Sequence, residues 1–295
     1  MFYPPFGGGA LCDKKTHPHS YAKNITLSAP VPLYHGAEKF YKERNTIAHA
    51  RQEAAAPCFK ENIMPLGFRV FTERVMPDPE LVAAFGNMAA APVADCMGRP
   101  CSMNPEIRLM TPPTGKSMVG VALTVKTQPN DNLMVQEALN LAKEGDILVV
   151  DNGGARACAL MGEIMFSYAK FKKLAGIVVD GPIRDLDCLE NIGLPIYAVC
   201  SIPGGPTKVG PGEVNVPVTC GGLNVNPGDI LLGDADGVIV IRREEAPALL
   251  EKAVAFCAQD SARTKAAKDG TCDRTWVRKA LLERNCEIIE GCWKP

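Results

Sequence analysis

An arginine and an aspartate stand side by side in the phrase DGPIRD, at positions 184 and 185. The planar guanidinium of Arg184 suits a carboxylate, and the oxygen atoms of Asp185 are ligands that Mg²⁺ and Mn²⁺ prefer. A neighbouring pair of this kind is more often a solvated ion pair on a protein surface. The pair therefore predicts a site for a small carboxylic acid and a hard cation only if a second element faces it.

A glycine-rich turn is the expected second element. The phrase DILVVDNGG predicts a strand that ends at Asp151 and a turn through Gly153 and Gly154, and a helical pattern over Ala157–Leu174 leads to a second strand, GIVVDG. Turns that follow neighbouring parallel strands emerge at the same edge of a sheet, where α/β proteins bind ligands. Amide groups near the start of the intervening helix can hold a carboxylate.

The elements that must position these turns follow from the hydrophobic pattern. Asp78 and Pro79 are suited to the cap and first position of a helix. A second helical pattern covers Asn132–Leu141. Runs rich in Val and Ile predict strands; they are SMVGVALTVKT, DILVVD, GIVVDG, PIYAVC and DILLGDADGVIVI. Because residues 196–241 show almost only strand and turn, we expect an α/β fold with a β-rich second half.

Residues 1–76 differ in amino-acid composition from the rest of the chain. They are rich in Pro, Gly, His and Tyr, with one possible helix near Glu38–Ala56, and we interpret them as an N-terminal extension of unknown role. We place the main domain at 77–270 and a C-terminal tail at 271–295. All four histidines lie in the extension, and HPH at His17–His19 alone lacks the three or four ligands that a zinc site needs.

The overall charge and the cysteines narrow the class of protein. The chain has 295 residues, and its 32 basic and 33 acidic side chains nearly cancel without forming a run, which disfavours nucleic acid and membranes as partners. The 12 cysteines are scattered without a CxxC pair, which favours free thiols. With no signal-peptide pattern and no apolar run of membrane-spanning length, we expect a cytoplasmic protein that binds a small molecule.

The span from Asp78 to Gly270 resembles a known family, which contains the 4-hydroxy-4-methyl-2-oxoglutarate / 4-carboxy-4-hydroxy-2-oxoadipate aldolases and the RraA regulators of ribonuclease E. The phrases that carry the resemblance are VADCMG, VGVALTVKT, GDILVVDNGG, ALMGEIM, GIVVDGPIRD and GPGEVNVPVTCGGLNVNPGDILLGDADGVIVI. The resemblance implies a β/β/α swivelling-type domain that assembles as a homotrimer or homohexamer. It does not cover the extension before Asp78.

The resemblance also implies roles at the DGPIRD motif. The regulators resemble YGAVRQ here and the aldolases resemble DGxxRD, so Asp185 favours the enzyme branch. Arg184 would bind the carboxylate and keto oxygen of a pyruvyl group. Asp185 would hold Mg²⁺ or Mn²⁺ directly, with water at most other positions of the ion.

Further roles follow for the phrase ALMGEIM and the C-terminal helical stretch. The backbone at Gly162, Ile164 and Met165 would receive the substrate carboxylate. Glu163 falls where the aldolases carry an acidic residue that contacts the water on the metal, although Glu163 is a longer acid than the aspartate expected there. Asp260 falls where the family places an acidic residue that reaches into a neighbouring subunit's site, but a helical aspartate among basic residues is usually solvated.

The implied function is that of a class II aldolase, which cleaves a 4-hydroxy-2-oxo acid to pyruvate and a second 2-oxo acid. Oxaloacetate decarboxylation is expected as well, because it passes through the same enolate. Two alternatives stay open: a non-catalytic regulator that binds a protein partner, and another lyase or hydratase for a related acid. A Schiff-base mechanism is disfavoured because Lys170, Lys172 and Lys173 crowd one helix turn, where lysines stay solvated.

Overall fold

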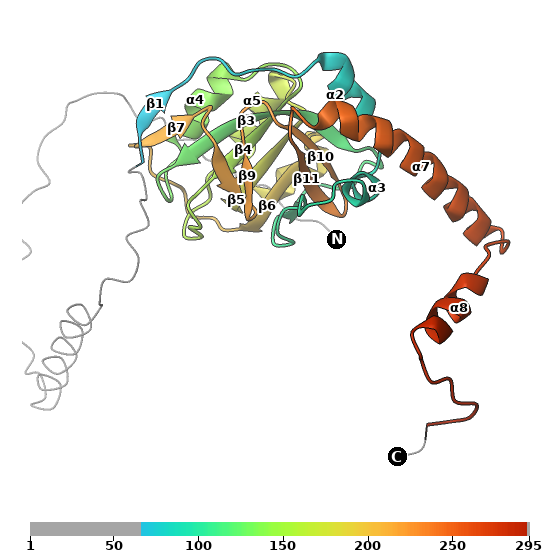
Figure 1. Cartoon of the computed structure of the whole chain (residues 1–295). Coiled ribbons are helices and arrows are strands. Elements are labelled where there is room, and N and C mark those ends of the chain that lie inside the picture. The colour runs from blue at the N-terminus through green and yellow to red at the C-terminus, as the bar shows by residue number, and fades with distance from the viewer. Residues whose placement is uncertain (1–65, 294–295) are drawn as a thin grey trace, which may run out of the picture. The chain divides into compact units, whose positions relative to one another are not determined.

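The computed structural model describes residues 66–293 (Figure 1). The expected helix near Glu38–Ala56 and the four histidines lie outside these residues. The strands are β1 (Phe68–Val70), β2 (Arg108–Leu109), β3 (Met118–Thr127), β4 (Asp146–Asp151), β5 (Gly176–Ile183), β6 (Ile196–Ser201), β7 (Gly212–Val214), β8 (Val218–Cys220), β9 (Leu223–Val225), β10 (Ile230–Asp234) and β11 (Gly237–Ile241). The helices are α2 (Pro79–Phe85), α3 (Ala90–Asp95), α4 (Leu133–Leu141), α5 (Glu163–Phe171), the 3₁₀ helix η1 (Leu186–Cys188), α6 (Leu189–Ile192), α7 (Ala246–Lys268) and α8 (Thr275–Glu283).

Four parallel strands form the centre of the main sheet. Strands β3, β4, β5 and β6 lie side by side in chain order, and α4, α5 and α6 lie in the three connections between them. The order across the sheet is β1-β7-β3-β4-β5-β6-β2, with the antiparallel pair β10 and β11 joined to β3. Strands β8 and β9 form a separate hairpin. The carboxyl ends of β3, β4 and β5 therefore open at one edge of the sheet.

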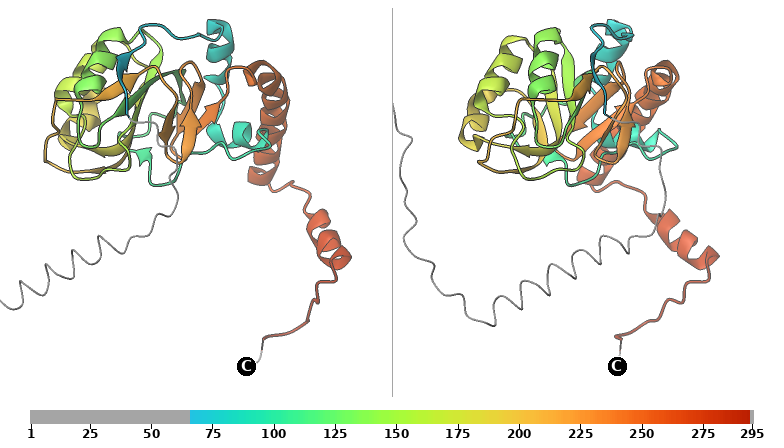
Figure 2. Two further views of the ribbon diagram at one scale, coloured as in Figure 1. Left: turned by 60° about the vertical axis from the view of Figure 1, so that its left-hand side comes forward. Right: turned by 90° about the vertical axis from the view of Figure 1, so that its left-hand side faces the viewer.

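The sheet carries helices on one face and further strands on the other. Along β4, Leu148 and Val150 pack with α4 and α5, whereas Ile147 and Val149 pack with residues of β8 to β11. Because both faces are covered, the central strands read as continuous apolar runs. A third core joins β10 and β11 to α2, α3 and α7, and Figure 2 shows α7 on the opposite side of the molecule from α4 and α5. This layering confirms the expected β/β/α fold.

One predicted helix start is confirmed by the structure and another is wrong. At α2, the Asp78 carboxylate accepts a hydrogen bond from the Glu80 amide at 2.9 Å and Pro79 opens the helix, as predicted. The helix predicted over Ala157–Leu174 begins only at Glu163 and ends at Phe171, so its first six residues were assigned wrongly. These residues bond to the chain around the end of β5 instead: the Leu160 amide donates to the Pro182 carbonyl at 2.9 Å.

Residues that the sequence places in the extension contribute to the sheet. Strand β1 pairs in parallel with β7, and the Asn215 side chain donates to the Phe71 carbonyl at 2.7 Å. Arg74 forms an ion pair with Asp146 at the start of β4, and the two side chains are only 4% and 1% exposed. The chain before residue 77 thus supplies both an edge strand and a buried counter-ion to the domain.

The C-terminal helix α7 is attached by its first half. Ala246, Leu249 and Ala253 are buried, and α7 contacts α2 and α3. Its second half, which includes Asp260, is exposed along almost its whole length and leads to α8, whose residues include none that are buried (Figure 2). Within residues 66–293, no helix combines the length and the apolar character that crossing a bilayer requires.

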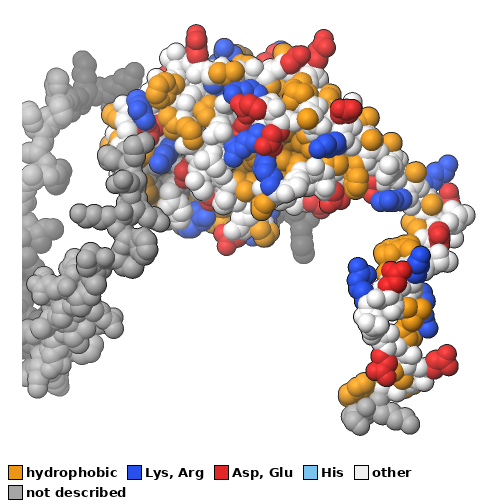
Figure 3. All heavy atoms as spheres, viewed as in Figure 1, with side chains coloured by type: hydrophobic (Ala, Val, Ile, Leu, Met, Phe, Trp, Pro, Cys, Tyr) orange, Lys and Arg blue, Asp and Glu red, His pale blue; other side chains and the backbone are white. Residues whose placement is uncertain are grey.

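The charged side chains are mixed on the face of the molecule that Figure 3 shows. Lys and Arg side chains alternate there with Asp and Glu, in keeping with the near-zero formal charge of −1. On this face of the described residues, neither sign of charge forms a continuous patch.

Candidate active site

The candidate site lies where β4 and β5 end. The strand register pairs Asp151 with Asp180, so the turns after these strands emerge at one edge, as the sequence predicted. The chain then continues from Ile183 into Arg184 and Asp185. The segment before α5 runs alongside this turn, because Met161 forms a bridge with Ile183 and accepts a hydrogen bond from the Arg184 amide at 3.0 Å.

A cavity of about 240 Å³ opens at this edge. It is bounded by the start of α4, the segment before α5 with the first turn of that helix, the turn after β5, and the loop before β7. Five of the residues proposed from the sequence line it: Gly162, Ile164, Met165, Arg184 and Asp185. The side chains of Arg184 and Asp185 are each 42% exposed, so both charged groups are accessible to a ligand.

Asp185 is held by the start of α5. Its Oδ2 atom accepts a hydrogen bond from the Glu163 amide at 3.0 Å and lies 3.6 Å from Nε of Arg184. The positive end of the helix dipole and the guanidinium both attract this carboxylate. The backbone of Asp185 is left-handed, with φ 61° and ψ 47°, a conformation that aspartate tolerates better than most residues. These constraints fix the carboxylate at the mouth of the cavity.

Gly162 makes this close approach possible. A Cβ atom at this position would lie 2.3 Å from Oδ2 of Asp185 and 2.9 Å from Cγ of Arg184. Only glycine therefore lets the segment before α5 pass beside the Arg184 and Asp185 side chains without displacing them. The phrase ALMGEIM contains this signal, since a glycine directly before a helix leaves room for a close contact.

The other residues of the ALMGEIM phrase contribute in different ways. Glu163 gives its amide to Asp185, while its own side chain is exposed on the first turn of α5. The Met165 amide donates to the Gly162 carbonyl at 3.0 Å, so that amide is already engaged. The Ile164 amide lies in the first turn, where a helix leaves its N–H groups without intrahelical acceptors. Of these amides, that of Ile164 is best placed to receive a ligand.

Lys208 is a cavity residue that the sequence reasoning missed. It lies in the loop before β7. The buried carboxylate of Asp131 anchors this loop on both sides of Lys208. Oδ2 of Asp131 accepts hydrogen bonds from the Thr207 hydroxyl at 2.7 Å and from the Val209 amide at 2.6 Å. Burial acts to raise the pKa of Asp131, but these hydrogen bonds and that of Leu133 outweigh it and lower the pKa. Lys208 is thus a second cation at the cavity, on a fixed loop.

Asn132 was missed as well. Its side chain is 3% exposed and lines the cavity, and its Nδ2 donates to the Leu160 carbonyl at 2.8 Å. Its Oδ1 is buried and finds no hydrogen-bond partner among the described residues. A buried acceptor without a partner is costly, so a donor from a ligand or water would stabilise it. The run Asn130–Asn132, just past the end of β3, carried a usable signal because β3 ends at the same edge as β4.

Asp151 and Asp180 stabilise the turns next to the site through hydrogen bonds and an ion pair. Asp151 accepts hydrogen bonds from the amides of Gly153 at 2.8 Å and Thr219 at 3.2 Å. Asp180 pairs with Arg156 at 2.9 Å and accepts the Gly221 amide at 2.9 Å. Burial raises the pKa of Asp151, while its hydrogen bonds act in the opposite direction. Both carboxylates therefore tie the β8–β9 hairpin to the sheet.

A metal would find one protein ligand here. Among residues 66–293, no group of three or more His, Cys, Asp or Glu side chains converges to hold an ion. Asp185 is nonetheless accessible, and one carboxylate with water in the other positions fits a hydrated Mg²⁺ or Mn²⁺. Asp260 does not line this cavity within one chain, because it lies in the exposed half of α7.

Known proteins that resemble this chain identify its family. Residues 90–240, just over half of the chain, match the RraA-like family, described as Aldolase/RraA. The chain belongs to the RraA-like family. A protein of Halalkalibacterium halodurans named "Putative 4-hydroxy-4-methyl-2-oxoglutarate aldolase" is 40% identical over 152 residues, which are 52% of this chain and 72% of that protein. A protein of the same name from Pseudomonas syringae pv. tomato is 34% identical over 145 residues, 48% of this chain and 90% of its own.

Solved structures agree with this assignment. The crystal structure of Streptomyces coelicolor RraAS2, described as an unusual member of the RNase ES inhibitor RraA protein family, matches the RraA-like chain with a TM-score of 0.59 and 27% identity. The match covers 64% of this chain and 98% of that one. The RraA-like family thus includes relatives named as aldolases and a relative described within an inhibitor family.

Proposed function

We propose that this chain is a divalent-metal-dependent aldolase. It cleaves 4-hydroxy-4-methyl-2-oxoglutarate or 4-carboxy-4-hydroxy-2-oxoadipate to pyruvate and a second 2-oxo acid, and it also decarboxylates oxaloacetate. The observation that carries the proposal is the cavity in which the Arg184 guanidinium lies beside the Asp185 carboxylate at the start of α5. The names of the two relatives support the choice of substrate.

Cleavage of such a substrate needs a place for an electron pair. The proton leaves the 4-hydroxyl group, the C4–O bond becomes a carbonyl, and the C3–C4 bond breaks. Its electron pair forms the C2–C3 double bond and leaves negative charge on the 2-oxo oxygen. C3 then takes a proton to give pyruvate. Arg184 lines the cavity, so its guanidinium is placed to stabilise this charge.

The cavity residues divide the recognition of the substrate. Arg184 binds the 1-carboxylate together with the 2-oxo oxygen, and the Ile164 amide completes the carboxylate site. Lys208 is available to bind a carboxylate at the far end of the substrate. Oδ1 of Asn132 is available to accept a hydrogen bond from the 4-hydroxyl group. Asp185 would hold a Mg²⁺ or Mn²⁺ ion, which supplies a Lewis acid at the 2-oxo oxygen when bound. Glu163, exposed beside Asp185, is the proposed acidic partner for proton transfer.

We further propose that the active form is a trimer or hexamer in which neighbouring subunits complete each site. Three exposed apolar side chains follow one another along α5: Ile164 at 83%, Tyr168 at 40% and Phe171 at 78%. The rings of Tyr168 and Phe171 are stacked with centroids 6.2 Å apart. An apolar strip that begins at a cavity is typical of a surface covered by a partner. Asp260 of a neighbouring subunit would then reach the Arg184 turn.

Subunit mixing tests the shared site. Inactive Arg184→Ala subunits are mixed with inactive Asp260→Ala subunits under conditions in which subunits exchange, and pyruvate release is measured. Some sites in the mixture contain neither substitution, so partial activity should return. If exchange is demonstrated but activity does not return, Asp260 has no role across the boundary. A monomer by light scattering would contradict the assembly itself.

Pyruvate formation tests the function. The full chain is assayed with Mg²⁺ or Mn²⁺ on a panel of 4-hydroxy-2-oxo acids and on oxaloacetate, with and without a chelator. We expect metal-dependent release of pyruvate, and we expect Asp185→Asn to reproduce the effect of the chelator. Asp187→Asn is the matched control, because this exposed neighbour does not line the cavity. Absence of pyruvate from every substrate would reject the aldolase and favour the regulator.

A further inference from the structure

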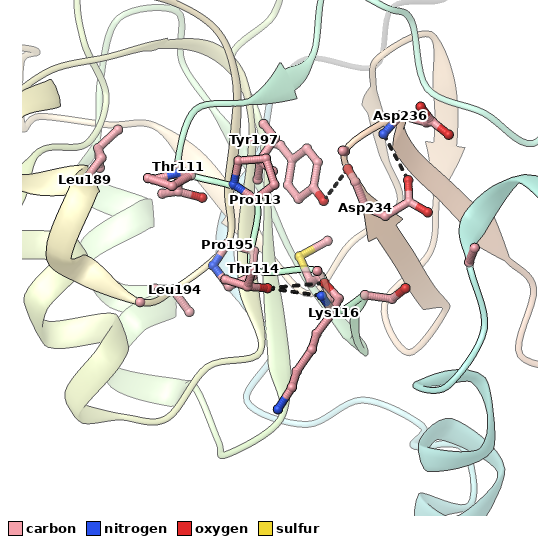
Figure 4. Close-up of a pocket in the computed structure, with 18 of the residues that line it drawn as sticks. Thr111, Pro113, Thr114, Lys116, Leu189, Leu194, Pro195, Tyr197, Asp234 and Asp236 are labelled. Carbon is pink, nitrogen blue, oxygen red and sulfur yellow. Dashed lines mark hydrogen bonds between the residues drawn. The ribbon is translucent and has the colours of Figure 1, made fainter.

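A second cavity lies at the opposite end of the parallel strands. Its volume is about 370 Å³, within the range of small-molecule sites. It is bounded by the first residue of β3, Met118, by the segment before β6, by the turn between β10 and β11, and by the loop 111–117 (Figure 4). The described residues that line it are all different from those that line the candidate active site. It is therefore a separate site and does not extend the first one.

Most of the wall of this cavity is apolar. The contributing side chains are Leu109, Pro112, Pro113, Leu189, Leu194 and Tyr197. They come from the two sides of the cavity: the chain from β2 through the loop 111–117, and the chain from α6 to β6. A ligand with an apolar body would gain from leaving water here.

Three of the four hydroxyl groups in the wall have already used their protons. Tyr197, Ser117 and Thr114 each donate to a backbone carbonyl oxygen, at 2.8, 2.7 and 3.4 Å. Figure 4 shows the Tyr197 hydroxyl directed at Asp234. Burial raises the pKa of Tyr197, and the Asp234 carboxylate adds to the effect, so this hydroxyl keeps its proton. These groups can still accept hydrogen bonds from a ligand but cannot donate to it.

The charged groups at the cavity are mainly acidic. Glu190, Asp234 and Asp236 line it, against a single cation, Lys116. The Asp234 carboxylate accepts the Ala90 amide at 2.8 Å and the Asp236 amide at 3.0 Å, which holds it in place. In Figure 4 the Lys116 side chain runs away from Tyr197 and Asp234. An anionic ligand would face three carboxylates, whereas a cationic donor would complement them.

The wall is mostly apolar, most of its hydroxyl groups already donate their protons, and its carboxylates outnumber its cations. We therefore propose that this cavity binds a small molecule that carries a protonated amino group on an apolar or aromatic body. The amino group lies toward the β10–β11 turn, where Asp234 and Asp236 accept its hydrogen bonds. The body lies between Pro113, Leu194 and the ring of Tyr197. Ligand binding here does not require the lyase activity proposed for the other end of the strands.

Methyl NMR of the full chain tests the site, with benzylamine as the probe and benzyl alcohol and benzoate as matched controls of neutral and negative charge. The Met118 methyl group reports on this cavity and the Met165 methyl group reports on the candidate active site. We expect benzylamine to shift the Met118 signal with a dissociation constant of about 1 mM, typical of such a small ligand. The Met165 signal should stay in place. Benzyl alcohol should bind more weakly and benzoate weakest.

Two variants make the assignment specific. Ala89→Phe places a ring into the cavity from an exposed position with an extended backbone, and it should abolish the Met118 shift. Asp236→Asn removes one exposed carboxylate and should weaken benzylamine binding about fivefold, the effect of one partly screened ion pair. Glu106→Gln is the control, an exposed carboxylate outside the cavity that should leave binding unchanged.

Three results would overturn the proposal. They are a Met118 signal that does not move at about ten times the expected dissociation constant, equal or tighter binding of benzoate, and benzylamine binding that Ala89→Phe and Asp236→Asn both leave unchanged. The measurement here is ligand binding at Met118. An absence of binding would therefore not contradict the proposed aldolase activity, and an absence of aldolase activity would not contradict this binding site.

Discussion

The two ends of the parallel strands offer opposite chemistry on one scaffold. At the carboxyl ends, the cavity presents Arg184, Lys208 and the Ile164 amide, which are hydrogen-bond donors suited to an anion. At the amino ends, the cavity presents carboxylates and hydroxyl groups, most of which already donate to backbone carbonyl oxygens. The direction of α5 contributes to the difference, since its positive end lies at the first cavity. A single sheet thus separates a cavity suited to anions from a cavity suited to cations.

The largest expected effect is that of Arg184→Lys, which breaks the anion-binding end alone. Lysine offers a point charge in place of a planar fork, so it cannot hold a carboxylate and a keto oxygen together. We expect kcat/KM for oxaloacetate to fall by about 100-fold or more. Arg108→Lys, at an exposed arginine on β2, is the control and should have no effect. A near-normal rate in the Arg184→Lys variant would show that the chemistry lies elsewhere.

A smaller effect is expected from Lys208→Met, which sharpens the assignment of the far end of the substrate. The loss of one charge-assisted contact should raise KM for a 4-hydroxy-2-oxo diacid by about tenfold. The KM for a 4-hydroxy-2-oxo acid without the second carboxylate should change little. Lys143→Met removes an exposed cation that does not line the cavity and serves as the control. An equal rise for both substrates would mean that Lys208 does not read the far carboxylate.

The smallest effect concerns the anchor of the Lys208 loop. Because the pKa of Asp131 is lowered in the folded chain, its stabilising contribution is present above the unfolded pKa of about 3.9 and is lost as the pH falls through the lower folded value. Asp131→Asn should therefore reduce the free energy of unfolding by about 1–3 kcal/mol near neutral pH. The difference from the unchanged chain should shrink below about pH 4. Denaturant titrations at several pH values measure both, and a constant difference would contradict this origin.

The sequence predicted the elements whose position depends on general rules. The strand that ends at Asp151 and the strand before Arg184 had to bring their turns to one edge, because parallel neighbours joined by a helix leave no other arrangement. The apolar runs of the central strands also allowed the layers to be inferred. The role of the Arg184 and Asp185 pair was inferred from family resemblance, since two adjacent charges say little by themselves.

What the sequence did not reveal depends on contacts between distant segments. Lys208 reaches the cavity only because Asp131, more than seventy residues earlier, holds its loop. The residues before Glu163 have helical spacing, but their hydrogen bonds to the end of β5 prevail over it. The amino-end cavity draws on residues from Ala89 to Asp236, and no local pattern unites them. Such sites follow from the packing of the whole domain.

The buried pair of Arg74 and Asp146 determines how far the chain can be shortened. A protein trimmed to begin at residue 77, where the sequence pattern suggests a domain start, would keep the Asp146 carboxylate at the base of β4 but lose its guanidinium. Removing one partner of a buried ion pair costs about 3–5 kcal/mol, a large share of the stability of an ordinary domain. The same cut would leave β7 as an unprotected sheet edge. We therefore expect the shortest self-sufficient folding unit to begin before β1, inside the segment that the sequence indicates as an N-terminal extension.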